Sequence, residues 1–209
     1  MSRYFLNLSR VFFLLAMAAI VGACAPIGPR GPEPVQYDLG VWTPASVAAT
    51  PPSAQQDVIV IPEIDARGVI DGQRIVYRFA QAQSYEPRVY NESRWAQPPA
   101  EMLRIRLQQQ LGLHYPVVLY GEWSGKEGWI LLLTLEDFSQ HFTSEQHSAG
   151  VVQLRATLLR NGEVLEQKLF HVEQVAGSAN AAGAVQALAQ ASDVVVQQVS
   201  QWVESRIRK

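Results

Sequence analysis

Four side chains that can bind metal ions or transfer protons lie close together between residues 137 and 147. They are Asp137, His141, Glu145 and His147. Imidazole and carboxylate groups are common zinc ligands and common general acids and bases. Their spacing matches neither the helical H-E-x-x-H motif nor the other common zinc patterns, and they fall where a predicted strand passes into a polar loop. The sequence therefore favours a solvated loop, with a metal site or a hydrolytic centre that uses His141 and His147 as the alternatives.

Other motifs that would indicate an enzyme are incomplete or missing. The segment from Gly121 to Lys126 has three residues between its glycines, where a phosphate-binding loop has four, and Glu127 stands where Ser or Thr would bind Mg²⁺. The chain has no G-x-S-x-G sequence, which carries the nucleophile of many serine hydrolases. We therefore expect no catalytic residues, no metal and no cofactor, and we interpret 121–126 as a turn between two strands.

The single cysteine, Cys24, follows an N-terminal segment with the features of a secretory signal. Two arginines precede an apolar run over 11–21, and small residues stand just before the cysteine. This run is shorter than the roughly 20 residues that a membrane-spanning helix needs. A cysteine at the first mature position is typical of bacterial lipoproteins, in which the thiol is acylated. We predict a signal peptide at 1–23, and a lipidated Cys24 with a flexible Pro/Gly-rich spacer over 24–34.

The residue after this cysteine bears on which membrane holds the anchor. Asp at this position favours retention in the inner membrane of Gram-negative bacteria, and the chain has Ala25 instead. We therefore expect attachment to the outer membrane, with the protein facing the periplasm.

The mature chain is acidic and has no cysteine left for a disulfide. Removal of 1–23 takes away Arg3 and Arg10, which leaves 15 Lys and Arg against 19 Asp and Glu. Nucleic acid binding is not expected, because it requires clustered basic residues. The remaining 186 residues suit one domain over 35–209 that is held together by apolar packing.

Hydrophobic periodicity predicts an α+β fold with a mainly antiparallel sheet and two helices packed on one face. Asn161-Gly162 predicts a two-residue hairpin turn. Apolar residues three and four apart predict helices over 100–111 and 178–206. Alternating and β-branched runs predict strands at 35–41, 58–61, 73–80, 85–90, 117–120, 129–138, 147–159 and 163–175.

Aromatic residues and arginines are concentrated just before the first predicted helix. Such side chains dominate binding hot spots, because they bury a large area and stack well. The alternative is that the aromatic rings belong to the core and the arginine stems cover them. The residues concerned are Tyr77, Arg78, Tyr85, Arg94 and Trp95.

The same segment resembles the ABC-type transport auxiliary lipoproteins. The resemblance rests on Val58 to Pro62, on the Tyr77-Arg78 pair, and on Arg94-Trp95-Ala96 with the prolines that lead into a helix. It implies a non-catalytic subunit of a paraquat-inducible or mammalian-cell-entry lipid transport system. In that family the Tyr-Arg and Arg-Trp pairs mark membership, and their role is either structural or in partner binding.

We therefore expect an auxiliary subunit of a transporter that moves lipids or other apolar compounds between membranes. Its expected partners are the membrane, through acylated Cys24, and a protein with mammalian-cell-entry domains. Lipid binding by the domain itself and self-association are left open. The alternatives are a lipid carrier, which predicts a closed apolar cavity between sheet and helices, and an envelope hydrolase.

Overall fold

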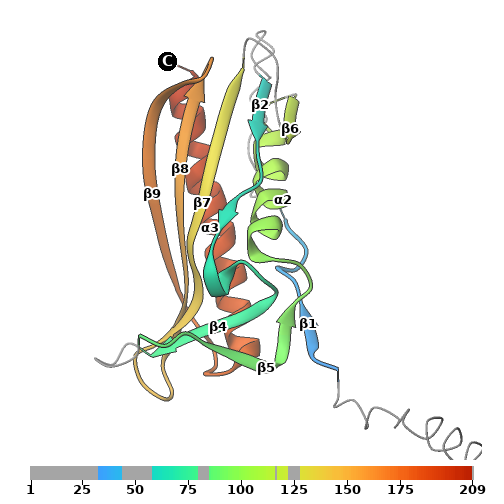
Figure 1. The fold of residues 1–209 in the computed structure, drawn as a ribbon, viewed down its shortest axis with the longest axis vertical. Helices are drawn as coiled ribbons and strands as arrows, with labels where there is room; N and C mark the ends of the chain where they lie inside the picture. Colours follow the sequence, from blue (N-terminus) through green and yellow to red (C-terminus); the bar gives the residue numbers. More distant parts are fainter. Residues whose placement is uncertain (1–32, 44–57, 80–84, 116, 122–127, 209) are drawn as a thin grey trace, which may run out of the picture. The chain divides into compact units, whose positions relative to one another are not determined.

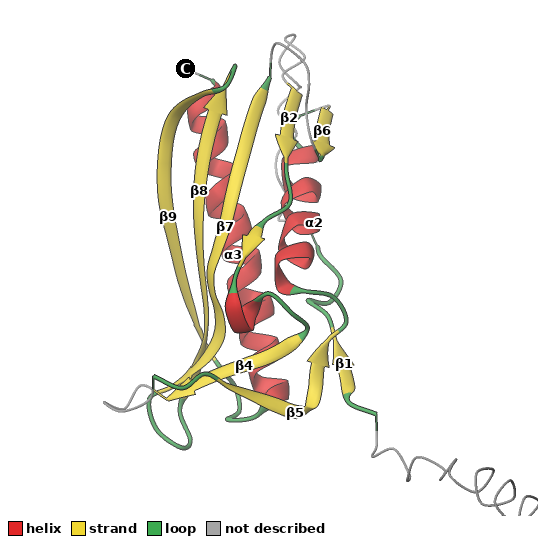
Figure 2. Ribbon diagram, viewed as in Figure 1, coloured by secondary structure: helices red, strands yellow, loops and turns green. Residues whose placement is uncertain are grey.

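In the residues that it describes, the computed structural model contains a nine-stranded sheet and two α-helices (Figures 1 and 2). By their internal contacts, Pro34–Lys209 form one unit. The predicted signal peptide, Cys24, nearly all of the loop at 43–56 and most of the turn at 121–126 lie outside the described residues. The structure describes residues 33–43, 58–79, 85–115, 117–121 and 128–208.

The longest strand, β7 (Trp129–Phe142), is the centre of the sheet. One of its edges pairs antiparallel with β8 (Ser148–Arg160) over the whole length of the strand. Its other edge is shared by three short strands that all run parallel to it: β2 (Val58–Ile61), β3 (Asp65–Ala66) and β4 (Arg74–Phe79). β7 therefore joins the two halves of the chain into one sheet.

Four more strands complete the sheet. β9 (Glu163–Val175) pairs antiparallel with β8, across the predicted hairpin turn. β5 (Arg88–Trp95) pairs antiparallel with β4, and β1 (Val35–Tyr37) lies parallel to β5. β6 (Val117–Tyr120) lies parallel to β2. Val58–Ile61 is thus an inner strand between β6 and β7, as its β-branched run predicts, and three of its four residues are buried.

The α+β class is confirmed, but the prediction of a mainly antiparallel sheet is wrong, because the sheet is mixed. Five strand pairs are parallel and three are antiparallel. The second half of the chain forms hairpins, whose turns are visible in the sequence. The first half contributes parallel strands, which need longer connections and leave no local turn signal.

Both helices are present close to their predicted ends. α2 (Pro99–Gly112) follows β5 directly, with proline in its first turn, and α3 (Ala181–Ile207) begins at Asn180, whose side chain accepts a hydrogen bond from the Gly183 amide at 3.0 Å. α3 packs against β7, β8 and β9, and α2 contacts α3 and β6. Among the described residues, no helix combines the length and the apolar character that a membrane span requires.

The core lies between the two helices and the sheet. Gly150 on β8 allows the helix to come close, because a Cβ at this position would lie 2.7 Å from the Leu188 amide nitrogen of α3. The hairpin turn between β8 and β9 is also confirmed, since both of its residues have positive φ angles, 53° at Asn161 and 85° at Gly162.

Candidate functional site

Four aromatic rings gather where β4 and β5 meet the end of β7, and we call them the aromatic patch. Alternation along β4 places Tyr77 and Phe79 on the same face of the sheet. The Tyr77 ring lies 4.8 Å from Tyr90 of β5 and 5.8 Å from Phe142 of β7, measured between centroids. The guanidinium of Arg88 lies 5.4 Å from the centroid of Phe79. All but Phe142 are half-buried or exposed, so this end of the sheet presents aromatic and arginine groups together.

A chain of hydrogen bonds fixes the patch to the sheet beneath it. The Tyr90 hydroxyl donates to Gln140 Oε1 at 2.6 Å, and Gln140 Nε2 donates to Ser148 Oγ at 2.7 Å. Burial, with a smaller contribution from Tyr77, raises the pKa of Tyr90 to about 12. The phenol is therefore a neutral donor at neutral pH, and it holds the ring in one orientation.

A polar cluster occupies the opposite face of the same strands. Asp137 accepts hydrogen bonds from Ser139 Oγ at 2.5 Å and from His141 Nε2 at 2.9 Å. Arg78 is the register partner of His141 on the neighbouring strand. Burial opposes ionisation of Asp137, but the hydrogen bonds from His141 and Ser139 outweigh it, and with the nearby charge of Arg78 they lower the pKa of the carboxyl.

This cluster has the residue types of a hydrolase triad without its geometry. Ser139 is fully buried, and its hydroxyl donates to Asp137. The same nitrogen of His141 contacts both Asp137 and Ser139, whereas a triad uses one ring nitrogen for each partner. The arrangement therefore stabilises an ionised aspartate and does not activate a serine.

The four residues of the predicted metal-like cluster are not brought together. Asp137 and His141 are bonded to each other, but His147 Nδ1 lies 2.9 Å from Ser144 Oγ within the following loop, and Glu145 is exposed. In the described part of the chain, no group of three or more His, Cys, Asp and Glu side chains could hold a metal ion.

The residues that mark the Arg-Trp segment lie away from the aromatic patch. Trp95, at the far end of β5, is fully buried, and its ring packs edge-on at 5.5 Å from Phe138. Its amide donates to the Gln73 carbonyl at 2.7 Å. Arg94 is half-buried between its register partners on β4 and β1, while Tyr85 is 93% exposed just before β5. The five sequence-predicted residues therefore occupy several environments and do not form one site.

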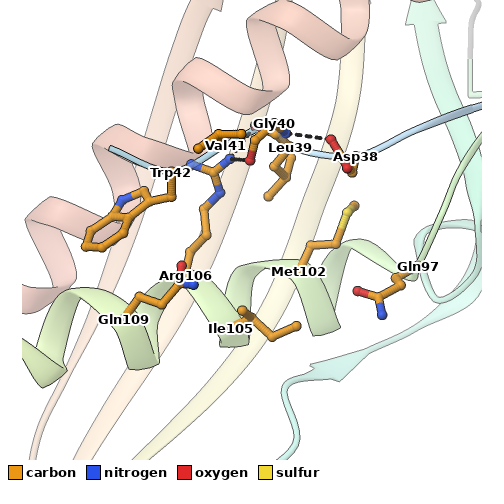
Figure 3. A pocket seen from close by; sticks show the side chains of 10 residues that line it. All are labelled: Asp38, Leu39, Gly40, Val41, Trp42, Gln97, Met102, Ile105, Arg106 and Gln109. Carbon is orange, nitrogen blue, oxygen red and sulfur yellow. Dashed lines mark hydrogen bonds between the residues drawn. The ribbon is translucent and has the colours of Figure 1, made fainter. Parts of the chain in front are cut away.

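A buried arginine on α2 ties the segment after β1 to both helices (Figure 3). Arg106 donates to the carbonyl oxygens of Leu39 and Gly40, the latter at 3.1 Å, and it pairs with Asp193 of α3. We call this set the arginine clamp. A charge that is 4% exposed requires such partners, because burying it without them would be costly.

The groove in Figure 3 lies between the segment after β1 and α2, with a volume of about 410 Å³. Met102 and Ile105 contribute apolar surface, but Arg106, Gln97 and Gln109 also line it. This mixed lining differs from the closed apolar cavity that a lipid carrier would need.

Comparison with known families gives the class of the protein. The model of the ABC-type transport auxiliary lipoprotein component matches residues 37–200, which include every described element from β2 to most of α3. The chain belongs to this family. No curated protein matches the chain.

Solved structures share the fold of this chain. A crystal structure of a Xanthomonas campestris protein is 21% identical, with a TM-score of 0.64, and the match covers 81% of this chain and 94% of that protein. A second, an uncharacterized protein, is 18% identical, with a TM-score of 0.60 and coverage of 82% and 99%. At these identities the likeness shows the fold.

Some residues that shape these auxiliary-lipoprotein surfaces were missed by the sequence analysis. Phe142 lies beyond the predicted end of its strand, and Gln140 carries no recognisable motif. Arg106 gave a usable signal: it directly precedes Leu107 in the apolar stripe of α2, where a charged residue requires a partner.

Proposed function

We propose that the protein is a lipid-anchored, non-catalytic auxiliary subunit of an ABC-type system that moves lipids or other apolar compounds between membranes. The acylated Cys24 would hold it to the outer membrane, facing the periplasm, and the domain would dock onto a partner with mammalian-cell-entry domains. The observation that carries this proposal is membership of the auxiliary lipoprotein family over residues 37–200.

The aromatic patch is the docking surface that we assign to this partner. Its rings are held in place by hydrogen bonds and by one another, so little conformational entropy would be lost on binding. Aromatic rings beside an arginine are the composition that protein interfaces use at their energetic centre. Tyr77 of the family-marking pair lies in this patch, and Arg78 serves the polar cluster on the opposite face.

Crosslinking in cells tests the docking surface. The protein is co-expressed with the mammalian-cell-entry protein of its own transport system, crosslinked with formaldehyde, and recovered from solubilised membranes. We expect Arg88→Glu to reduce recovery of the partner strongly, because it replaces the cation over the Phe79 ring with an anion. Arg67→Glu is the matched control, since both arginines are exposed and pair with an exposed acid two residues away. Equal recovery with both variants would refute the assignment of the patch, and recovery of no partner by the natural protein would refute the proposed function.

Membrane fractionation tests the anchor separately. We expect Cys24→Ala to release the protein from membranes or to leave its signal uncleaved, while the purified domain keeps its unfolding midpoint. Ala25→Asp should keep the protein lipidated but move it to the inner-membrane fraction. An outer-membrane location that is unchanged in Cys24→Ala would exclude the thiol as the anchor.

A further inference from the structure

The last strand of the sheet has an edge with no partner strand. β9 pairs with β8 on one side, and no described strand pairs with its other side. Every second residue of such an edge turns its N–H and C=O groups away from the sheet, where another strand can bind them. With 13 residues, β9 is long for an edge strand.

Exposed apolar side chains are concentrated on this strand. Four of the ten large hydrophobic residues that are exposed in the described part of the chain lie on β9, namely Val164, Leu165, Leu169 and Val175. Proteins usually protect an edge strand by making it short or charged. β9 carries four charged residues, Glu163, Glu166, Lys168 and Glu173, but it is long and keeps these apolar side chains exposed between them, which favours an edge that a partner covers.

A groove runs between this edge and the C-terminal part of α3. Lys168 to His171 form the strand side, and the helix side is a stripe from Gln198 to Arg206 with three- and four-residue spacing. The groove has a volume of about 580 Å³, and the buried rings of Phe170 and Trp202, with centroids 5.8 Å apart, form part of its floor. A free strand edge beside a helix gives an incoming strand both main-chain partners and side-chain pockets.

Two cations, Lys168 and Arg206, line the groove together with the imidazole of His171, whose Nε2 lies 2.9 Å from Glu173 Oε1. Arg206 is paired with Glu166, and the hydrogen bonds from Arg206 and Trp202 lower the pKa of that carboxyl to about 2. Lys168 has no ion-pair partner among the described residues, and its ammonium lies 5.0 Å from the Phe170 ring centroid. Its charge acts on the neighbouring Glu166 carboxylate without forming an ion pair, so its ammonium can still pair with an acid on an incoming strand.

We propose that the groove between β9 and α3 binds an extended segment of another protein, which adds a strand to the free edge of β9 and places one acidic side chain opposite Lys168. Main-chain hydrogen bonds would supply affinity, and an acidic side chain opposite Lys168 would supply selectivity. A lysine on an edge repels basic strands, so the same residue would exclude wrong partners. This surface is distinct from the aromatic patch, and the proposal does not depend on the identity of the transport partner.

Peptide binding to the full-length protein in detergent tests the proposal. The probes are two fluorescent ten-residue peptides of alternating Thr and Val that differ only in one central residue, Glu in one and Lys in the other. By fluorescence anisotropy we expect the Glu peptide to bind about fivefold more tightly. Lys168→Glu should reverse this preference, whereas Arg67→Glu, on a different surface, should leave it unchanged.

A third probe tests whether the backbone is used. Two versions of the Glu peptide are made, each with N-methyl groups on alternate residues, so that one version is methylated along one edge and the other along the opposite edge. Each version retains its charge but cannot form main-chain hydrogen bonds along its methylated edge. We expect one of these versions to lose binding entirely. The proposal would be overturned if both methylated versions bound equally well. It would also be overturned if Lys168→Glu left the preference for the Glu peptide unchanged, or if the Glu peptide did not bind at millimolar concentration. If peptide binding were lost as the protein concentration rises, the β9 edge would be assigned to a second copy of the chain. This result would also overturn the proposal.

Discussion

The two ends of β5 carry similar residues that serve different purposes. At one end Trp95 is fully buried and packs on Phe138. At the other end Tyr90 and Arg88 belong to a half-exposed patch, where the Tyr90 hydroxyl donates to Gln140 and the Arg88 guanidinium lies over the Phe79 ring. An aromatic residue next to an arginine therefore does not indicate its role by itself. Burial separates the two ends, because only surface that is still exposed in the folded domain can bind a partner.

The largest expected loss of stability is at the buried end of β5, at Trp95. We expect Trp95→Ala to lower the free energy of unfolding by about 3–5 kcal/mol, because it leaves a cavity beside Phe138. Urea unfolding followed by far-UV circular dichroism measures this loss. Trp95→Phe keeps most of the ring volume and should lose clearly less. A loss below about 1 kcal/mol in Trp95→Ala would show that this end is not core.

The arginine clamp should give the next largest effect. Arg106→Ala removes the donors to the Leu39 and Gly40 carbonyls and the partner of Asp193, so we expect a loss of about 2 kcal/mol. Hydrogen exchange should also show faster exchange over 35–40. Gln109→Ala, which alters an exposed side chain of the same groove, is the control and should change neither quantity.

Asp137, on the face of the sheet opposite the aromatic patch, should make the stability of the fold depend on pH. The pKa of Asp137 is lower in the folded protein than in the unfolded chain, so its contribution to stability is present above the unfolded value of about 4 and is lost as the pH falls through the folded value. We expect urea midpoints of Asp137→Asn to fall less steeply below about pH 4 than those of the natural protein. Glu92→Gln, at an exposed position of β5, controls for the loss of one charge. Parallel curves for the natural protein and Asp137→Asn would contradict this account.

The smallest effect is expected at the patch itself. Tyr90→Phe removes the hydrogen bond to Gln140 but keeps the ring, so the loss should be about 1 kcal/mol by urea unfolding. Tyr85→Phe, at a residue that is 93% exposed, should change stability by less than about 0.5 kcal/mol. A loss in Tyr90→Phe as large as that in Trp95→Ala would remove the distinction between the two ends.

Local signals in the sequence account for the second half of the fold. The turn at Asn161-Gly162 and the bounds of β9 match the prediction, because hairpins and their alternating residues are close in sequence. β7 continues four residues beyond its predicted end at 138. Residues 139–141 are polar and give no strand signal, and it is their pairing with β4, which is distant in sequence, that extends the strand.

The first half depends on contacts that are distant in sequence. β5 reaches Trp95 although Asn91 to Arg94 have no strand-like alternation, because β4 and β1 both pair with this stretch. The aromatic patch could not be assembled from the sequence for the same reason, since Phe142 joins it only through the parallel pairing of β4 with β7. The clustering of Tyr and Arg was visible, but the division of these residues between two faces and two ends of the sheet was not.

The position of β1 sets the path by which tension would enter the domain. If the chain is anchored at Cys24, a pull on the anchor reaches the fold first at Val35, in a three-residue strand that lies parallel to β5. Such a short ladder shears under modest force, and the arginine clamp is the second restraint, because it holds the next residues to α2 and α3. While the ladder between β1 and β5 is intact, the load would pass into β5, whose other end forms part of the aromatic patch. Mechanical pulling and partner docking would act on the same strand from its two ends.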